Sequence, residues 1–585
     1  MTLIGKLTDG LEKRYKIFTI LAPLTMLGEV AMEVIIPIIM ANIIDAGISS
    51  GNINYVLKTG MLMIGCTCLS LFCGVASGRL SALASTGFSH NLRRRLFAKV
   101  QDFAFSNMDK FGTASMITRL TTDVTNAQNT YQMIIRICVR SPMMLIGATI
   151  MACLINAKLA VTFFLAIPIL AIALAAIATK AFPRFREMLK KYDTLNSGLQ
   201  ENLMGIRVVK SFVREGFEED KFQDIANQVR EAQVKAEKIV IFNMPIMQIM
   251  MYACIIVILW AGGNMVISQT MQTGELISFV TYVTQILMSL MMISMIFVML
   301  VLSKASIARI VEVLDEKPAI TDNAKEMTAN SCAAVSTGKV EFHNVSFSYE
   351  EESFVLKNIN LTIESGQTAG IIGGTGSAKT TLVQLIPRLY DVASGQVLVD
   401  GKDVRQIEIE TLRNSVAMVL QKNVLFSGTI LDNLRWGNVN ATYEQIVSAC
   451  KAAQAHSFIS SFPEGYKTVL GQGGVNLSGG QKQRLCIARA LLKEPKILIL
   501  DDSTSAVDTA TDANIRKALK ATLPDSTKII ISQRITSIKD ADIIFVMDNG
   551  EIAASGTHEN LLDSCGIYQE VFKSQQRGDG QCHNQ

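Results

Sequence analysis

The chain has 585 residues, is 49% hydrophobic and carries a net charge of only +4. This length predicts several domains, and so weak a net charge gives no support to nucleic-acid binding. The eleven cysteines have neither the spacing of a zinc site nor that of a disulfide framework. Hydrophobic residues are unevenly distributed, because residues 1–310 consist largely of long apolar runs whereas residues 338–575 have the composition of a soluble α/β domain.

The first 310 residues are predicted to form an all-α membrane domain. Residues 1–16, where basic residues stand among Leu, Ile and Tyr, predict a short helix at the membrane surface. Within residues 17–310, six apolar segments reach the length of about 20 residues that a membrane-spanning helix needs. They are residues 18–46, 56–84, 134–156, 159–181, 238–263 and 275–303. The alternative, buried helices of a soluble protein, is disfavoured because six such runs exceed what one soluble core needs.

The distribution of Lys and Arg predicts the orientation in the membrane. The short connections hold only Lys158 as a positive charge, whereas the long connections, at about 85–133 and 182–237, are rich in Lys and Arg. By the positive-inside rule, a multi-pass protein of the cell membrane is expected, with both termini, both long connections and everything after residue 310 in the cytoplasm. The long connections are expected to be helical extensions that turn near Thr113–Asp123 and Glu201–Ser211.

Charged residues inside the predicted membrane segments are few. Glu29 and Glu33 lie four residues apart on one face of the first helix, Arg79 lies in the second, and Arg136 and Arg140 begin the third. Charge inside a membrane indicates a functional site by default. Two interpretations remain open: the charges pair across the helix bundle or line a water-filled cavity as structural groups, or Glu29 and Glu33 bind a cation and are candidate substrate residues.

The soluble part is predicted to follow a linker. Residues 311–337 contain a helix-breaking Pro318 and a small, polar stretch, and we interpret them as that linker. Residues 338–575 are expected to form the α/β domain, which begins with an alternating, strand-like segment at Lys339–Tyr349. Residues 576–585 are expected to be a polar tail.

A glycine-rich stretch between a predicted strand and a predicted helix has the form of a phosphate-binding loop. It consists of Gly373, Gly374, Thr375, Gly376, Ser377, Ala378, Lys379, Thr380 and Thr381. Backbone N–H groups of such a loop point at phosphate oxygens, and the following helix adds its dipole. We expect Lys379 to reach the outer phosphates of a nucleotide and Thr380 to hold Mg²⁺. Ala378 stands where the pattern has glycine, so its methyl group is expected to crowd the loop or the β-phosphate without abolishing binding.

Four further stretches follow in a fixed order. Val419–Gln421 ends a strand, Leu477–Gln481 begins a helix, Ile497–Asp502 is an apolar strand that ends in two carboxylates, and Ser505–Asp508 follows at once. A carboxylate at the end of such a strand suits Mg²⁺ beside the phosphate loop. The helix start at Leu477–Gln481 predicts a second anion-binding site, although one domain needs only one.

Together these motifs resemble the nucleotide-binding domain of ATP-binding cassette (ABC) proteins over about residues 340–575. The preceding 310 residues resemble the six-helix half of a type IV ABC exporter, and the two helical turns resemble its coupling helices. The resemblance implies that Tyr349 stacks on adenine, that Gln421 contacts Mg²⁺ and senses the membrane domain, and that Asp501 is the Walker B aspartate. It also implies that Asp508 lies in the D-loop at a dimer interface. The implied fold is therefore an all-α six-helix transmembrane domain followed by an α/β P-loop NTPase domain.

The resemblance further implies that ATP is bound between two cassettes. One cassette supplies the phosphate loop and Asp501, and the other supplies a signature motif that binds the γ-phosphate. In this chain the signature motif consists of Ser478, Gly479, Gly480 and Gln481.

Two positions depart from the family pattern. Asp502 stands where the family usually has a glutamate that polarises the attacking water, and Gln533 stands where it usually has the switch histidine. The aspartate is shorter by one C–C bond, about 1.5 Å, and a misplacement of about 1 Å can cost on the order of 10²-fold in rate. Glutamine can form a hydrogen bond but cannot carry a charge. Neutral drift at both positions is the alternative; a site that binds ATP and hydrolyses it poorly is the interpretation we prefer.

These features predict one subunit of a heterodimeric ABC exporter for drug-like or amphipathic compounds. Its intact signature motif is expected to complete the ATP site of a competent second half-transporter. A homodimeric lipid or peptide exporter with slow turnover, and an ATP-gated channel or regulator, remain as alternatives. The six apolar segments exclude a soluble ABC ATPase of DNA maintenance.

Overall fold

The computed structural model describes residues 3–322, 335–349 and 353–581. The chain divides into two compact units. The helical unit contains Met1–Gln101 and Thr113–Glu316, and the cassette unit contains Asp102–Gly112 and Lys317–Gln585. The second unit is therefore built from two separate pieces of the sequence.

The helical unit contains six helices that are long and apolar enough to cross a membrane, among the residues that the structure describes. Its elements are α1 (Leu3–Thr8), α2 (Lys13–Asn42), η1 (Ile43–Ile48), α3 (Ile53–Gln101), α5 (Thr113–Thr118), η2 (Arg119–Asp123), α6 (Val124–Ile155), α7 (Ala157–Met204), α8 (Ile206–Ser211), α9 (Glu215–Val240), α10 (Asn243–Ile267) and α11 (Thr273–Asp315). The π-helical segment η1 directly follows α2 and ends in a turn, whereas the π-helical segment η2 joins α5 to α6 without a break. The six predicted membrane segments coincide with these helices, so the all-α, six-helix prediction is confirmed.

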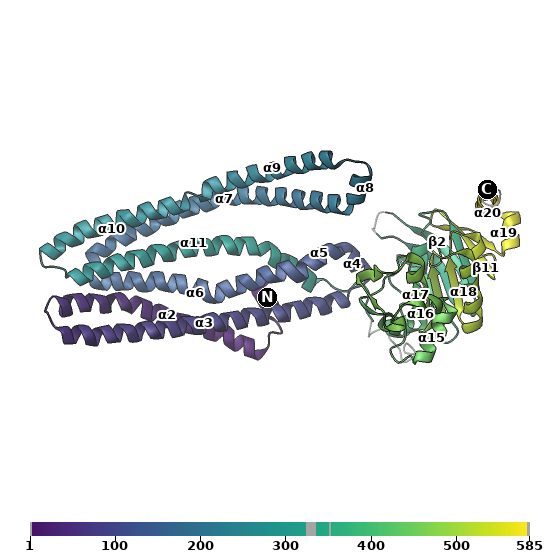
Figure 1. The fold of residues 1–585 in the computed structure, drawn as a ribbon, viewed down its shortest axis with the longest axis horizontal. Coiled ribbons are helices and arrows are strands. Elements are labelled where there is room, and N and C mark those ends of the chain that lie inside the picture. Colours follow the sequence, from purple (N-terminus) through teal and green to yellow (C-terminus); the bar gives the residue numbers. More distant parts are fainter. Residues whose placement is uncertain (1–2, 323–334, 350–352, 582–585) are drawn as a thin grey trace. The chain divides into compact units, whose positions relative to one another are not determined.

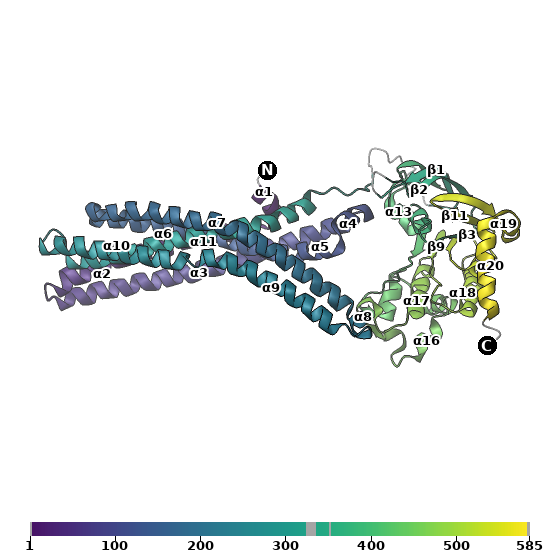
Figure 2. The same cartoon turned by 90° about the horizontal axis from the view of Figure 1, so that it is seen from above.

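Helices α2 and α3 run side by side, α6 lies along α11, and α7 lies along α9 (Figures 1 and 2). Between them, Phe163 of α7 stacks on Phe279 of α11 with ring centroids 5.1 Å apart. The buried hydroxyl of Tyr282 donates to the carbonyl oxygen of Val34 at 2.6 Å, which ties α11 to α2. At one end α7 and α9 diverge from α6 and α11 and form an arm that is closed by α8 (Figure 2).

The positions of the two helical turns agree with the sequence in one case and differ in the other. Helix α8 forms the turn that was expected near Glu201–Ser211. The first turn is not at Thr113–Asp123, which is helical throughout as α5 and η2. The turn lies directly before this range in the sequence, where α4 (Phe105–Phe111) ends at Gly112. Gly112 has a left-handed backbone with φ of 72°, which glycine adopts without a steric cost and which stops the helix there.

Helix α4 folds with the cassette unit. The hydroxyl of Tyr390 donates to Asp109 at 2.7 Å, and the ring of Phe105 lies 6.0 Å from that of Tyr390. The amide of Asn107, which is 4% exposed, accepts from the backbone N–H of Ala319 at 2.8 Å and donates to the carbonyl oxygen of Lys317 at 3.0 Å. One buried side chain therefore ties α4 to the segment that follows α11 in the sequence.

The cassette unit is built on two sheets. The larger sheet has the strand order β12-β11-β3-β10-β9-β6, and the smaller has the order β2-β1-β4-β5. In the larger sheet β11, β3, β10, β9 and β6 are parallel neighbours, while β12 and the smaller sheet are antiparallel. The strands are β1 (Val340–Phe347), β2 (Leu356–Ile363), β3 (Thr368–Gly373), β4 (Ser394–Val399), β5 (Lys402–Asp403), β6 (Val416–Val419), β7 (Gly428–Thr429), β8 (Val469–Leu470), β9 (Ile497–Asp501), β10 (Thr527–Ile531), β11 (Ile543–Asp548) and β12 (Glu551–Gly556).

Helices cover the sheets and enclose two hydrophobic cores. They are α12 (Lys379–Gln384), α13 (Ile409–Ser415), α14 (Ile430–Arg435), α15 (Tyr443–Ala452), α16 (His456–Ser461), α17 (Gly479–Leu491), α18 (Thr509–Thr522), α19 (His558–Ser564) and α20 (Gly566–Gln581), with short 3₁₀ turns at η3 (Gly465–Lys467), η4 (Gln472–Gly474) and η5 (Ile535–Ser537). With this arrangement of strands and helices, the predicted α/β fold of the cassette unit is confirmed.

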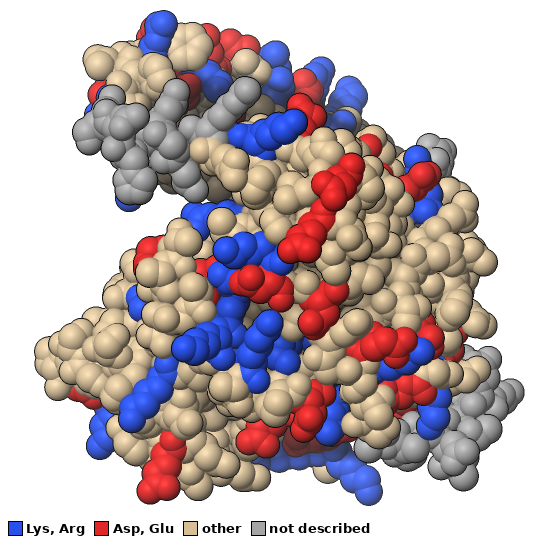
Figure 3. Space-filling view, turned by 90° about the vertical axis from the view of Figure 1, so that its right-hand side faces the viewer, with Lys and Arg blue, Asp and Glu red and all other residues tan. Residues whose placement is uncertain are grey.

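On the face shown in Figure 3, Lys and Arg side chains gather near the middle with Asp and Glu side chains beside them.

Two predicted boundaries need correction. Helix α11 continues to Asp315, so the linker expected from residue 311 begins after that residue. Residues 323–334 of the predicted linker lie outside the described residues. The expected tail at 576–585 begins inside α20, which reaches Gln581. In α11 and α20 the polar residues remain helical, so the change to polar composition does not mark the end of the helix.

Candidate nucleotide-binding site

The glycine-rich loop joins the buried strand β3 to helix α12. The ammonium group of Lys379 donates to the carbonyl oxygens of Gly373 and Gly374 at 3.0 and 2.7 Å and to Oγ of Ser377 at 3.1 Å. A Cβ on Gly373 would lie 2.2 Å from the carbonyl oxygen of Met547, so only glycine fits there. The loop therefore wraps around the lysine as a phosphate-binding loop does.

Ala378, the departure within the loop, has a left-handed backbone with φ of 67°. An L-residue other than glycine pays roughly 1–2 kcal/mol for this conformation. Its methyl group packs against the core beneath the loop. The cost of alanine at this position thus lies in the backbone, and the predicted crowding of a phosphate stays a prediction.

Asp501 and Thr380 form a site that suits a divalent cation. The hydroxyl of Thr380 donates to Oδ1 of Asp501 at 3.1 Å. Asp501 is 2% exposed, and its Oδ2 is buried without a hydrogen-bond partner among the described residues. Burial raises the pKa of the Asp501 carboxyl, and the neighbouring charge of Asp502 raises it further. A carboxylate that is disfavoured in this way is stabilised by a bound cation, and its free oxygen and the hydroxyl are the hard ligands that Mg²⁺ prefers.

Asp502 follows directly and also has a left-handed backbone, with φ of 46°. Burial raises the pKa of the Asp502 carboxyl, while the charges of Lys379 and Arg534 oppose that rise. Burial lowers the pKa of Lys379, and the charges of Asp501 and Asp502 counteract the shift. The structure thus brings Lys379, Asp501 and Asp502 together. Asp and Asn populate left-handed conformations more readily than most side chains, so an aspartate suits this backbone.

Gln533 is exposed at the end of β10, and its carbonyl oxygen accepts from Nε2 of Gln575 in α20 at 2.7 Å. The next residue, Arg534, donates to the carbonyl oxygens of Ser505 and Val507 at 3.2 and 3.3 Å. This arginine couples the switch position to the Ser505–Asp508 loop. The sequence analysis missed it, and its position directly after Gln533 was the only signal.

The signature motif begins helix α17 with a reciprocal cap. The N–H of Ser478 donates to Oε1 of Gln481 at 2.9 Å, and the N–H of Gln481 donates to Oγ of Ser478 at 3.4 Å. A Cβ on Gly480 would lie 2.8 Å from the carbonyl oxygen of Ala506, so the helix packs closely on the next loop. The side chain of Gln483, also missed from the sequence, accepts from the N–H of Ala506 at 3.1 Å.

Asp508 closes this loop by capping α18. Its carboxylate accepts from the N–H of Thr511 at 2.9 Å, and this hydrogen bond lowers the pKa of the Asp508 carboxyl. The predicted signature and D-loop are therefore neighbours in one packed substructure.

The remaining predicted nucleotide-binding residues are Tyr349, which lies beside the phosphate loop, and Gln421, whose predicted contact the structure does not test. The hydroxyl of Tyr349 lies 2.9 Å from Oγ1 of Thr381, which places this aromatic residue beside the loop. Gln421 lies just after β6 and is exposed, and among the described residues its side chain forms no hydrogen bond. Its contact with Mg²⁺ stays a prediction. Within the described residues, no hydrogen bond or ion pair joins the signature motif to the phosphate loop.

The intramembrane carboxylates both reach one arginine. Nη2 of Arg140 lies 2.7 and 2.9 Å from the two carboxylate oxygens of Glu33. Nη1 of Arg140 lies 3.6 Å from Oε1 of Glu29. The charges of α2 and α6 therefore pair across the bundle, as one of the two sequence interpretations has it.

A six-helix membrane unit joined to a phosphate-loop ATPase unit defines an ATP-dependent membrane transporter. Residues 19–290 match the family described as "ABC transporter transmembrane region", and residues 356–505 match that described as "ABC transporter". The chain is 39% identical over 564 residues to the uncharacterized ABC transporter ATP-binding protein YfiB of Bacillus subtilis, which covers 96% of this chain and 97% of that one. It is 35% identical over 493 residues to an ATP-dependent lipid A-core flippase of Desulfotalea psychrophila, covering 83% and 84%.

The fold is also that of a solved structure described as a bacterial Atm1-family ABC exporter with ATP bound. The TM-score is 0.83 at 25% identity, and the match covers 96% of this chain and 99% of the other. This chain therefore belongs to the ABC transporter family. It is a multi-pass half-transporter of the exporter type, in which a transmembrane domain and an ATPase domain are fused.

Proposed function

We propose that this chain is one subunit of a heterodimeric ATP-driven exporter. Its own phosphate loop, Asp501 and Asp502 bind ATP and hydrolyse it slowly, and its signature motif completes the ATP site of a second, hydrolytically competent half-transporter. The observation that carries this proposal is the pair of departures at Asp502 and Gln533 beside a complete signature motif.

Nucleotide binding follows from the groups already described. Thr380 and Asp501 would hold Mg²⁺, which when bound neutralises charge on the outer phosphates. The ammonium group of Lys379 leaves the loop carbonyls and donates to those phosphates. The ring of Tyr349 stacks on the adenine. Asp502 sits too far back to orient the attacking water well, and Gln533 offers a neutral amide where a charge-bearing group would help.

A second chain is supported by two features. The phosphate loop and the signature motif are not joined within one chain, so each needs its complement from another cassette. The region of α8 carries apolar side chains at a tip expected outside the membrane: Val208 is 60%, Phe212 72% and Val213 80% exposed. Such clustered apolar exposure marks a protein interface, and we propose that this tip docks on the cassette of the second subunit.

The membrane orientation and the cargo are part of the same proposal. In this proposal both termini and the ATPase domain lie in the cytoplasm of a cell-membrane protein, and the distribution of Lys and Arg supports this orientation. Drug-like or amphipathic molecules are the proposed cargo.

A homodimeric lipid exporter is the second candidate, favoured by the relatives named as lipid A-core flippases. In that case both sites would turn over slowly. A channel or regulator gated by ATP is the third, since poor hydrolysis also suits a protein that only senses ATP.

The test is to express the gene with its genomic neighbours and to ask whether a second half-transporter co-purifies. The chain alone should show little ATPase activity, and the pair should show much more. ATP-driven uptake of a dye into inverted vesicles then separates a transporter from a channel or regulator. Brisk ATPase activity from a verified homodimer, equal to that of the pair, would contradict the heterodimer.

A further inference from the structure

A group of four charged side chains lies inside the helical unit. Glu29 and Glu33 come from α2, and Arg136 and Arg140 come from α6. We call these four residues the charged cluster. All of them lie within helices long and apolar enough to cross a membrane, where charge is expensive and is retained for a purpose.

Two glycines of α3 make room for the cluster. A Cβ on Gly74 would lie 3.0 Å from Cδ and Oε2 of Glu29, and one on Gly78 would lie 3.9 Å from Cζ of Arg136. Positions four residues apart on a helix are neighbours on one face, about 5–6 Å from each other. Glu29 and Arg136 therefore lie against the same face of α3, about one helical turn apart.

Each of these two residues has unused binding capacity. Glu29 is 8% exposed, and its Oε2 is buried with no hydrogen-bond partner among the described residues. Arg140 does not donate to Oε2 of Glu29, because its closest contacts are with the carboxylate of Glu33. The guanidinium of Arg136 forms neither a hydrogen bond nor an ion pair with any described residue.

A third unsatisfied group lies nearby on α11. Gln285 donates to the carbonyl oxygen of Glu33 at 3.4 Å, and its own Oε1 is buried without a partner among the described residues. Buried polar atoms without partners cost free energy. A ligand that supplies both a donor and an acceptor would remove these costs.

The charge balance decides which ligand fits. The cluster has two carboxylates and two guanidinium groups, so it is neutral as a whole. A bound cation would leave one excess positive charge and a bound anion one excess negative charge, which a membrane interior disfavours. Arg79 does not alter this balance, because it is exposed and lies next to Gly78 in sequence, on a different side of α3.

We propose that the charged cluster binds the zwitterionic group of a transported molecule. Its ammonium donates to Oε2 of Glu29, and its phosphate or carboxylate accepts from Arg136. This inference rests on the proposed export function and names a substrate class for it. An ethanolamine phosphate head group of a lipid and the charged ends of a short peptide share this chemistry.

The first experiment varies the charge of the ligand on the unaltered complex in proteoliposomes. Trileucine with free termini is compared with its N-acetylated and C-amidated forms, and acyl-labelled phosphatidylethanolamine with acyl-labelled phosphatidylglycerol. ATP-driven movement of the label or peptide is measured, together with stimulation of ATPase activity. Preference for the zwitterion in either series supports the proposal, and the series that responds tells peptide from lipid. A preference for the amidated peptide, or for the acetylated peptide and phosphatidylglycerol, overturns it.

The second experiment assigns the effect to residues. Glu29→Gln and Arg136→Gln should each raise the half-maximal concentration of the zwitterion about tenfold, as expected for losing a hydrogen bond to a charged group. Arg79→Gln, the matched control next to Gly78 but on a different side of α3, should leave that concentration unchanged. Equal response of all three variants overturns the proposal.

The two levels of inference fail differently. If no compound is moved by ATP in the unaltered complex, export itself is wrong and so is this inference. If export occurs without preference for zwitterions, only the present inference is wrong. Binding of a fluorescent ATP analogue reports whether each variant is folded, and the ligand series on the unaltered complex decides the matter if a variant is not.

Discussion

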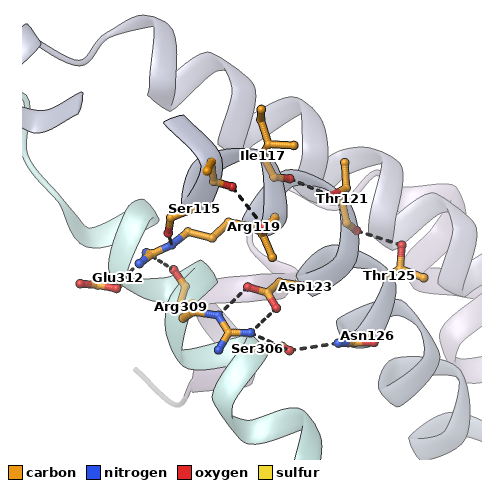
Figure 4. Close-up of polar contacts among 12 residues, drawn as sticks. Ser115, Ile117, Arg119, Thr121, Asp123, Thr125, Asn126, Ser306, Arg309 and Glu312 are labelled. Carbon is orange, nitrogen blue, oxygen red and sulfur yellow. Dashed lines mark hydrogen bonds and ion pairs between the residues drawn. The ribbon is translucent and has the colours of Figure 1, made fainter. Parts of the chain in front are cut away.

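Asp123 and Arg309 form a two-pronged ion pair between the end of η2 and the C-terminal part of α11 (Figure 4). Nε and Nη2 of Arg309 lie 2.7 and 2.5 Å from the two carboxylate oxygens of Asp123. Asp123 is 0% exposed and ends the π-helical segment η2. The hydrogen bonds to Asp123 raise the pKa of Arg309, so the arginine stays charged.

The same two elements are joined at further points (Figure 4). Arg119, also in η2, donates to the carbonyl oxygen of Arg309 and lies 2.8 Å from a carboxylate oxygen of Glu312. One turn into α6, the side chain of Asn126 donates to Oγ of Ser306 at 3.2 Å. The C-terminal part of α11 is thus held by η2 and the first turn of α6.

We predict that Arg309→Gln destabilises the protein more than Asp123→Asn. Removing the arginine leaves a buried carboxylate without a counter-charge, whereas Asp123→Asn leaves an arginine that is half exposed and can be hydrated. The loss for Arg309→Gln should be on the order of 2 kcal/mol, below that of a fully buried pair. Arg309→Lys should fall between, because lysine lacks the planar fork. Thermal unfolding of the purified complex gives the order, and Asp123→Asn as the worst variant would contradict it.

Asp502→Glu alone should recover little ATPase activity at this chain's own site. Glutamate would reach further, but it would have to adopt the left-handed backbone of Asp502, and Gln533 would still carry no charge. Asp502→Glu with Gln533→His should recover more than the sum of the single changes, because groups that act as a unit are not additive.

The measurement is steady-state ATPase activity of single and double variants. The second subunit's catalytic glutamate is changed to glutamine in all of them, so that its site is silent. Turnover typical of the family from Asp502→Glu alone would remove Gln533 from the explanation.

Two neighbouring glycines allow a test of the signature motif that separates folding from function. A Cβ on Gly479 would meet Cβ of Ala506 at an ordinary 3.6 Å, whereas one on Gly480 would lie 2.8 Å from a backbone oxygen. Gly479→Ala should therefore leave thermal stability unchanged and nearly abolish turnover of the complex. Gly480→Ala should lower both.

Lys379→Ala is the comparison at the phosphate loop. It should weaken nucleotide binding at this chain's own site and leave more of the turnover than Gly479→Ala does. If Lys379→Ala were the more damaging for hydrolysis, the competent and the slow site would have to be exchanged.

Asp400 gives a prediction for pH. Its carboxylate accepts from the N–H groups of Ser336, Thr337, Gly338 and Lys339 at 2.6 to 3.0 Å. Burial alone would raise the pKa of Asp400, but these hydrogen bonds and that of the Thr337 hydroxyl outweigh it and lower the pKa to about 2. A lowered pKa stabilises the fold above the unfolded-state value of about 3.9, and that stability is lost as the pH falls toward 2.

Asp400→Asn should accordingly lower the melting temperature of the cassette at pH 7 by about 2–4 °C, the shift expected for 1 kcal/mol in a domain of this size. The difference from the unaltered protein should shrink below pH 4. A difference that stays constant down to pH 3 would show that the charge of Asp400 is not involved.

Much of the architecture follows from the sequence because membrane helices and phosphate loops have strong local signals. The apolar length of α2 or α10 is set by the bilayer, and the lysine of the loop has to follow the glycines directly. Turns between long polar helices lack such a signal. Gly112 marks the end of α4, but Thr113–Asp123 is equally polar and was chosen wrongly for that reason.

The sequence does not predict which side chains, far apart in the chain, contact one another. The spacing of Glu29 and Glu33 puts them on one helix face, but nothing in the sequence shows that both reach Arg140 or that Gly74 lies against Glu29. Arg534 and Gln483 carry no motif of their own. Arg534 donates to carbonyl oxygens and Gln483 accepts from an N–H group of the Ser505–Asp508 loop, which is remote in sequence from both residues.

The docking of α4 on Tyr390 sets an order of events during synthesis. The two residues of the contact, Asp109 and Tyr390, are 281 positions apart. A ribosome that adds about 5–20 residues per second needs roughly 14–56 s to make the second after the first. Helix α4 is therefore synthesised before four more membrane helices are inserted. It has no folding partner until the cassette has been made. During that interval α4 lacks the residues on which it packs, and a cassette produced from residue 317 onward would lack α4 altogether.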